Sequence, residues 1–403
     1  MSLIKEYIKL TNDYILEYGE KTVILMMVGS FYEIYGEIDN NKNISGSKIV
    51  EISKICDLKI ATKVPGIVMA GFTEKKIDKY LYKIQEEGYT IVVIIQNENN
   101  PQSRYVEGIY SPGTYFKDDT IEISNNVMCI WIERITYMKN KSIVTGVANV
   151  DIFTGRPTMF EINVENHHNP TTYDELERIV STYNPSEVII ISNVSSKEVD
   201  DIINYSGIKS KNNHIILLEN EKSNSSFLEK AKKCEKQIYR DEVLNKFYEF
   251  EIVESFNQNN YKNEYACQAL TFLLNFLYEH NPSLVNKIRE PIFENKSDRV
   301  ILANHSLKQL NIIDDENYSG KLSSVSTFLN NCITSMGSRK FKYNLLAPTF
   351  NIEKLKEEYN ITEHLIEDCE KKSTIWRKHM YDIKDIEKLY RQIIHKKITP
   401  RKL

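Results

Sequence analysis

The sequence predicts a multidomain α/β protein in which two mixed α/β segments are followed by a helical one. Three observations lead to this fold class. The chain has 403 residues, too many for one hydrophobic core, which favours two or three domains. Short apolar runs of strand length alternate with amphipathic helical stretches through residues 1–255. From residue 256 onward, the apolar positions recur at helical spacing.

The first predicted domain covers residues 1–120. Its predicted elements are a helix at 4–18, strands at 22–27 and 31–35, a helix at 74–87 and a buried strand at 89–96. Gly19 and Gly88 are typical of positions just past the end of a helix. The Ser-Pro-Gly-Thr turn at 111–114 closes this domain.

The second predicted domain covers residues 125–255, and the third covers residues 256–403. In the second, three strands precede a helix at 173–183 and a further strand, which favours a small α/β domain with a mixed sheet. The third opens with a strongly apolar helix at 266–280 and has long helical periodicity at 352–395. Because the sequence ends within that helical pattern, we expect it to be part of a longer protein.

The composition excludes some classes of protein. Charged residues make up 27% of the chain and hydrophobic residues 41%, which is ordinary for a globular protein in water. The net charge of -4 means that contacts with nucleic acid must come from local basic patches. The six cysteines form no C-x-x-C pair, which excludes a zinc knuckle or a disulfide framework. No apolar run approaches the roughly 18 residues that span a bilayer. We therefore expect an intracellular protein without membrane contact and without a metal site.

The motif Gly29-Ser30-Phe31-Tyr32-Glu33 is the strongest candidate for function. Side chains two residues apart on a strand point to the same side, so Phe31 and Glu33 project together while Tyr32 faces the core. An exposed aromatic ring beside a carboxylate is unusual on a protein surface. The simplest interpretation is structural, with Phe31 packed in a core and Glu33 solvated.

The stretch ILMMVGSFYEIYGE around this motif resembles the mismatch-reading strand of MutS-family DNA mismatch-repair proteins. VMAGF, an amphipathic helix, YTIVVIIQ and YSPGT follow it in the order found in the family. ILANHSLKQLNII, STFLNNCITSMGSRKFKYNLLAPT and DIKDIEKLYRQI resemble landmarks of the family's helical core and lever. The resemblance therefore extends over nearly all 403 residues and is weakest at 195–250.

This resemblance implies a mismatch-binding domain, then a ribonuclease-H-like α/β connector, then the start of a helical core and lever domain. The implied function is binding of mismatched bases or small loops in double-stranded DNA for mismatch repair. Phe31 would enter the minor groove as a wedge, and Glu33 would lie beside a base edge. An alternative within the family is a non-enzymatic, architectural binder of DNA junctions, against which the pair of Phe31 and Glu33 argues.

Phosphate contacts are expected from nearby cations, for which Lys63 and Arg104 are the candidates. Either residue could instead be a solvated surface cation. The family often carries an arginine shortly before the Pro-Gly-Thr turn, where this sequence has Gly108. We therefore expect the contact with the DNA backbone to be weaker or to move to Arg104.

We expect no enzymatic activity and no catalytic residues. The nearest strings to the phosphate-binding pattern G-x-x-x-x-G-K-S/T are GEKT at 19–22 and SGKL at 319–322, which lack its glycine spacing. Asp151 lies on a predicted strand as a nuclease carboxylate would, but cleavage with two metal ions needs several carboxylates. Relatives bind ATP and Mg, act as dimers and recruit a MutL-type protein. The resemblance thus implies these partners for a longer protein and no cofactor on this chain.

Overall fold

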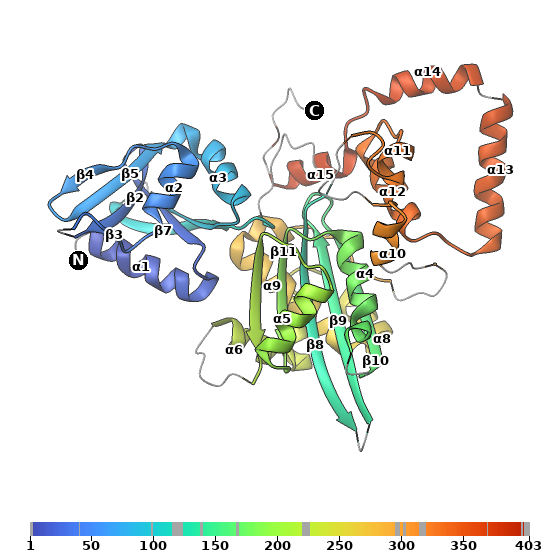
Figure 1. The fold of residues 1–403 in the computed structure, drawn as a ribbon, viewed down its shortest axis with the longest axis horizontal. Coiled ribbons are helices and arrows are strands. Elements are labelled where there is room, and N and C mark those ends of the chain that lie inside the picture. The colour runs from blue at the N-terminus through green and yellow to red at the C-terminus, as the bar shows by residue number, and fades with distance from the viewer. Residues whose placement is uncertain are drawn as a thin grey trace.

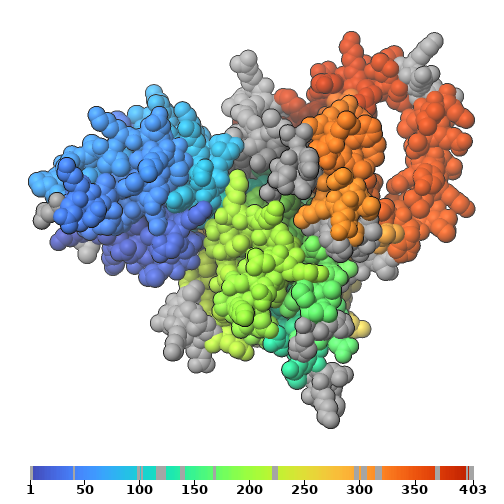
Figure 2. Space-filling view, viewed as in Figure 1, coloured from blue at the N-terminus to red at the C-terminus, as the bar shows by residue number. Residues whose placement is uncertain are grey.

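The computed structural model has two α/β units followed by helices, which confirms the predicted fold class. It describes residues 3–39, 41–97, 100–114, 124–137, 140–166, 169–219, 226–294, 299–300, 304–313, 320–368, 370–395 and 398. Figure 1 shows the first unit (blue) beside the second (green to yellow), with the last helices (orange and red) beyond the second. Figure 2 shows the first two units in contact, whereas the red helices stand away from the orange ones and leave an opening.

The first unit is built on one mixed sheet. Its strands lie in the order β4 (Ala61–Val64), β5 (Ile67–Thr73), β2 (Phe31–Ile38), β1 (Thr22–Val28), β6 (Thr90–Asn97) and β7 (Asn100–Tyr110), with β3 (Ile44–Ser45) beside β2. β1 pairs with β6 in parallel, and the other pairs are antiparallel. The β1–β2 hairpin therefore lies in the middle of the sheet and not at an edge.

Helices cover both faces of this sheet. They are α1 (Leu3–Tyr18), α2 (Ile49–Cys56), the short 3-10 helix η1 (Glu74–Lys76) and α3 (Ile77–Glu86). α1 lies on one face, where the Tyr7 hydroxyl donates to the Ile24 carbonyl at 3.1 Å. α2 and α3 lie on the other face, where the ring centroids of Phe72 and Tyr80 are 4.4 Å apart (Figure 1). Because both faces are covered, the central strands β1 and β6 are nearly continuous apolar runs.

The second unit has a mixed sheet, as predicted, and the sheet has six strands. Its strands lie in the order β12 (Asn212–Leu217), β11 (Glu187–Ser192), β8 (Asn126–Tyr137), β9 (Asn140–Asp151), β10 (Arg156–Glu165) and β13 (Ile292–Phe293). β8, β9 and β10 are antiparallel neighbours, and β11 and β12 continue the sheet parallel to β8. The helices of this unit are η2 (Pro170–Tyr173), α4 (Asp174–Tyr183), α5 (Ser196–Tyr205), α6 (Ser226–Cys234), α7 (Gln237–Leu244), α8 (Phe250–Asn260), α9 (Glu264–His280) and η3 (Pro282–Val285).

Helix α9 packs across β8 and β9 of this second sheet. Gly146 of β9 allows the close approach, because a β-carbon there would come within 2.2 Å of the Tyr265 carbonyl carbon. β13 follows α9 in the chain and pairs in parallel with β10. The second unit therefore continues past residue 255, its predicted end. Helical periodicity shows that a helix is buried, but it does not show which sheet the helix covers.

The last described part of the chain is mainly helical. Its helices are α10 (Asn304–Gln309), α11 (Val325–Leu329), α12 (Ser335–Leu346), α13 (Ile352–Asp368), α14 (Glu370–Met380) and α15 (Ile386–Ile394). α13 and α14 form an extended arm, and α15 returns to the second unit (Figure 1). Arg391 of α15 is buried there and donates to the carbonyls of Asn286 at 2.9 Å and Leu284 at 2.5 Å. Nowhere in the described ranges does a helix combine the length and the apolar character needed to cross a membrane.

The turn at 111–114 joins the two α/β units through Glu187, which is fully buried at the start of β11. The Ser111 hydroxyl and the Gly113 N–H, the latter at 3.2 Å, both donate to its Oε2. Its Oε1 accepts from Asn212 Nδ2 at 3.2 Å and lies 2.8 Å from His214 Nε2. Although burial acts to raise it, the hydrogen bond with His214 holds the pKa of Glu187 below its ordinary value. A carboxylate thus fastens the linker turn to the second sheet.

An apolar contact between the units lies beside this carboxylate. Tyr18 of α1 packs edge-to-face against Phe227 and His280, with ring centroids 5.6 Å and 5.3 Å apart. The same buried cluster extends from Ile24 in the first sheet to Trp131 in the second. Burial lowers the pKa of His280 to about 4, so this ring is neutral within the cluster near pH 7. One buried cluster therefore runs through both units, while the second unit also has a separate cluster of its own.

Candidate nucleic-acid interface

Phe31 begins β2 immediately after the turn of the central hairpin. Gly29 has a left-handed conformation in this turn, with φ +61°, and its N–H donates to the Gln96 side chain at 2.9 Å. Val28 and Phe31 are cross-strand partners, so the ring lies at the end of the hairpin. Phe31 is 46% exposed, whereas Tyr32 beside it is 3% exposed. This exposure contradicts the interpretation of Phe31 as a core residue.

Glu33 lies on the same side of β2 as Phe31 but is mostly covered. The register of β2 with its neighbours places both side chains on one face, as strand alternation predicts. Glu33 is only 9% exposed, and the Nζ of Lys63 lies 2.5 Å from its Oε2. The Tyr35 hydroxyl donates to the same oxygen. The interpretation of Glu33 as a solvated carboxylate is therefore wrong.

Lys63 reaches Glu33 from the edge strand β4. The pairing of β4 with β5 shifts register at Lys63, and such a bulge redirects a side chain. Gly71 of β5 is the cross-strand partner of Glu33 and has no side chain to obstruct the lysine. The Nζ of Lys63 is also 3.0 Å from the Tyr35 hydroxyl oxygen and 4.8 Å from the centroid of its ring. Lys63, predicted as a phosphate contact, is thus engaged with Glu33 in this structure.

Arg104 lies on β7, on the other side of the hairpin from Lys63. Its Nε donates to the Met27 carbonyl at 3.4 Å, and its cross-strand partner is Gln96, which holds the turn. Burial and then the hydrogen bond with Glu33 raise the pKa of Tyr35, whereas the charge of Arg104 opposes the shift. The Tyr35 hydroxyl therefore stays protonated and remains a donor, and Arg104 contributes positive potential beside it.

All four predicted residues are thus gathered around the central hairpin of the first sheet. Sequence reasoning missed Tyr35, which connects Glu33 and Lys63. The sequence does indicate it, because Tyr35 stands two residues after Glu33. Strand alternation therefore places Phe31, Glu33 and Tyr35 on the same side.

Gly108, where the family resemblance suggested an arginine, is buried within β7. A β-carbon there would lie 3.2 Å from atoms of the Tyr110 side chain. A long side chain at this position would require the Tyr110 ring to move. Arg104 is the one cation in the sequence of β7, so it is the residue of this strand that could contact a phosphate.

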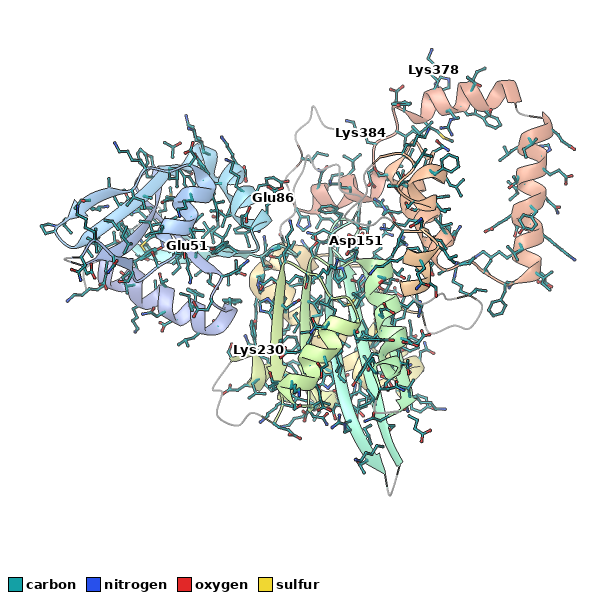
Figure 3. The ribbon with its side chains drawn as sticks, in the orientation of Figure 1. Glu51, Glu86, Asp151, Lys230, Lys378 and Lys384 are labelled. Atoms are coloured by element: carbon teal, nitrogen blue, oxygen red, sulfur yellow. The ribbon has the colours of Figure 1, made fainter. Side chains whose placement is uncertain are left out.

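Asp151 lies at the end of β9, where the second sheet meets the C-terminal helices (Figure 3). Its buried carboxylate accepts the N–H groups of Asn125 and Phe153, both at 3.1 Å, and the Thr154 hydroxyl at 2.7 Å. Burial raises the pKa of Asp151, and these hydrogen bonds oppose the shift. The carboxylate therefore closes a turn. Among the residues that the structure describes, no group of three or more His, Cys, Asp or Glu side chains is placed to hold a metal ion.

A cavity of about 1150 Å³ lies beside Asp151, between the second sheet and helices α12 and α15. Arg156 and Arg339 line it, but each is already paired with Glu387, at 3.0 Å and 2.7 Å. The two arginines therefore stabilise the packing of α15 against the second sheet and α12, and the cavity lies between these elements.

Two family models match the chain. The model described as MutS domain I matches residues 2–119, and the model described as MutS domain III matches residues 305–403. The first match contains the central hairpin with all four predicted site residues, and the second contains the helices from α11 to α15.

Curated relatives match nearly the whole chain. A mutS homologue of Acanthamoeba polyphaga mimivirus is 27% identical over 95% of this chain. The DNA mismatch repair protein MutS of Petrotoga mobilis is 25% identical over 100% of it, and a mitochondrial mutS homologue of Sarcophyton glaucum is 22% identical over 96%. The chain spans only 36%, 43% and 42% of the lengths of these relatives.

Proposed function

Because this chain belongs to the MutS family, we propose that it binds mismatched or unpaired bases in double-stranded DNA as the recognition part of a mismatch-repair protein. The observation that carries this proposal is the half-exposed Phe31 ring at the end of a central hairpin, with a carboxylate on the same face. Arg104 lies on one side of that hairpin and supplies positive charge that a DNA backbone requires, while Lys63, on the other side, is paired with Glu33.

A phenylalanine wedge detects the deformability of DNA and not its sequence. Pushing a ring between base steps costs a few kcal/mol of unstacking. A mismatched pair is already poorly stacked, so the cost is lower there. The Phe31 ring can then stack on a displaced base, which is worth about 1–3 kcal/mol. Binding should therefore favour a mismatch over a paired duplex.

Glu33 adds specificity by making the binding of normal duplex less favourable. A carboxylate near phosphates disfavours every duplex, whereas at a mismatch it can accept a hydrogen bond from an unpaired base edge. In this structure Lys63 neutralises part of that charge. Glu33 thus weakens binding to matched duplex more than binding to mismatched duplex, which widens the difference between the two binding free energies.

The longer relatives suggest where other activities lie. We propose that ATP and Mg binding, the dimer contact and recruitment of a MutL-type partner belong to regions of those relatives beyond the span that this chain matches.

The alternative function, binding of DNA junctions, predicts DNA binding that does not depend on Phe31.

We predict that the 403-residue chain does not hydrolyse ATP, because its sequence has no glycine-spaced phosphate loop. Steady-state ATP hydrolysis, measured with mismatched DNA present, should match that of a Lys21→Ala, Lys321→Ala double variant, which alters the two nearest strings. Turnover that the double variant abolished would show that one of these strings binds phosphate after all.

We predict that Glu33→Ala narrows the gap between mismatched and matched duplex mainly by tightening binding to the matched one. The change removes a negative charge and releases Lys63 to reach a phosphate. Matched affinity should rise by roughly threefold to tenfold. The slope of log affinity against log salt should become steeper by about 0.9. Fluorescence anisotropy with both duplexes over a range of salt concentrations measures these quantities.

The matched control is Glu51→Ala, which removes the same charge from an exposed position on α2 (Figure 3), on the opposite face of the sheet. It should leave both affinities nearly unchanged. Equal weakening of both duplexes by Glu33→Ala would instead assign Glu33 a role in folding.

A further inference from the structure

We infer that Tyr35 and Lys63 are positioning residues for Glu33, which hold its carboxylate in one orientation beside the Phe31 wedge. This inference rests on the proposed function. It adds two residues that act on discrimination without touching a base themselves.

The two contacts converge on one atom of the carboxylate. The Tyr35 hydroxyl donates to Oε2 of Glu33, and the Nζ of Lys63 lies 2.5 Å from the same oxygen. Neither contact involves Oε1. Among the residues that the structure describes, the carboxylate is held through Oε2, which leaves Oε1 available in a fixed direction as an acceptor for an unpaired base edge.

Tyr35 is itself rigidly held, so it can serve as the fixed point. It is fully buried, and its ring packs edge-to-face against Tyr7 with the centroids 5.2 Å apart. Tyr7 is anchored in turn by its hydrogen bond to the Ile24 carbonyl. The Ser47 hydroxyl donates to the Tyr35 carbonyl at 2.5 Å and fixes the backbone. The direction of the Tyr35 hydroxyl is therefore set by the core of the first unit.

Lys63 completes the arrangement from the opposite side. It donates to the Tyr35 hydroxyl oxygen at 3.0 Å as well as to Glu33, so the three groups form a closed ring of contacts. Its positive charge also offsets the repulsion between Glu33 and phosphates as the wedge approaches DNA. Gly71 keeps the path between β4 and β2 open, as described above.

The test is a double-mutant cycle on discrimination, defined as the ratio of mismatched to matched affinity. Tyr35→Phe should lower this ratio by about threefold to tenfold, the usual range for the net contribution of one hydrogen bond. In a Glu33→Ala background the same substitution should have no effect on the ratio, because Tyr35 acts through Glu33. Lys63→Met should also lower the ratio, and Lys63→Arg should retain most of it.

Two matched control variants separate an effect on the orientation of Glu33 from a general loss of stability. Tyr248→Phe removes a tyrosine hydroxyl that donates to a backbone carbonyl, that of Arg289 at 3.0 Å, in the second unit and away from Glu33. Lys21→Met removes a lysine that also lies over a tyrosine ring, at the opposite end of β1 from the hairpin turn. Both controls should leave the ratio unchanged, whatever they do to thermal melting.

Each outcome has one meaning. An equal loss from Tyr35→Phe in the wild-type and Glu33→Ala backgrounds would overturn the positioning role, as would a ratio that Tyr35→Phe leaves unchanged. A wild-type chain that binds both duplexes equally would overturn the proposed function itself. A wild-type chain that discriminates through Phe31, with Tyr35→Phe neutral, would leave the proposed function intact and remove only this inference.

Discussion

Phe31→Ala is expected to weaken binding to mismatched duplex by about tenfold to hundredfold while leaving matched duplex nearly unchanged. The substitution removes the stacking of the ring on a displaced base, which contributes about 1–3 kcal/mol to binding. This stacking forms only where a base can be displaced. Matched binding depends on phosphate contacts, so its affinity and its salt slope should stay as they are. Fluorescence anisotropy on a pair of duplexes that differ by one base measures both affinities.

The control for this experiment is Phe72→Ala. Phe72 is 4% exposed and packs under the opposite face of the same sheet, so its loss should cost about 3–5 kcal/mol of stability. Phe31 is 46% exposed, and Phe31→Ala should therefore hardly change thermal melting. A large drop in melting temperature with unchanged discrimination would contradict the wedge, and unchanged affinity for mismatched DNA would favour a junction binder.

Glu187→Ala is expected to lower the free energy of unfolding by about 3–5 kcal/mol, because it leaves buried donors without their acceptor. The Ser111 hydroxyl, the Gly113 N–H and the Asn212 side chain all donate to this carboxylate. The linker turn should therefore lose its attachment to β11. Urea unfolding followed by tryptophan fluorescence is a suitable measurement, because Trp131 is buried in the same second unit.

Glu177→Ala is the matched control for that prediction. Glu177 is also buried in the second unit, on α4, but within the described part of the chain its Oε2 has no hydrogen-bond partner. Its removal should be nearly neutral or stabilising. If Glu177→Ala and Glu187→Ala cost the same, the hydrogen bonds of Glu187 would not be the source of its effect.

Local patterns in the sequence predicted most of the first unit. Gly19 and Gly88 follow helices α1 and α3 and have φ of +94° and +81°, as helix ends of this kind require. The apolar run after Gly88 is the buried strand β6, and alternation placed Phe31 and Glu33 on one side of β2. These features depend on neighbours in sequence, which a single sequence records.

Features that depend on strand order could not be predicted. The contact of Lys63 with Glu33 exists because β4, β5 and β2 are adjacent and because Gly71 lies between the two side chains. Similarly, the apolar helix α9 was expected to open the third domain but packs on the second sheet through the space left by Gly146. The long helical periodicity at 352–395 is divided among α13, α14 and α15.

The buried cluster that runs through both α/β units has a mechanical consequence for the wedge. If Phe31 is the wedge that we propose, opening a base step would push back on it, and that force would pass through the hydrogen-bonded strands beside the hairpin into the first sheet. From there it would meet the packed contact of Tyr18 with Phe227, and a close-packed interior deforms little under load. On this proposal the hairpin is a stiff element fixed to a body of two domains, and we expect the work of insertion to deform the DNA more than the protein.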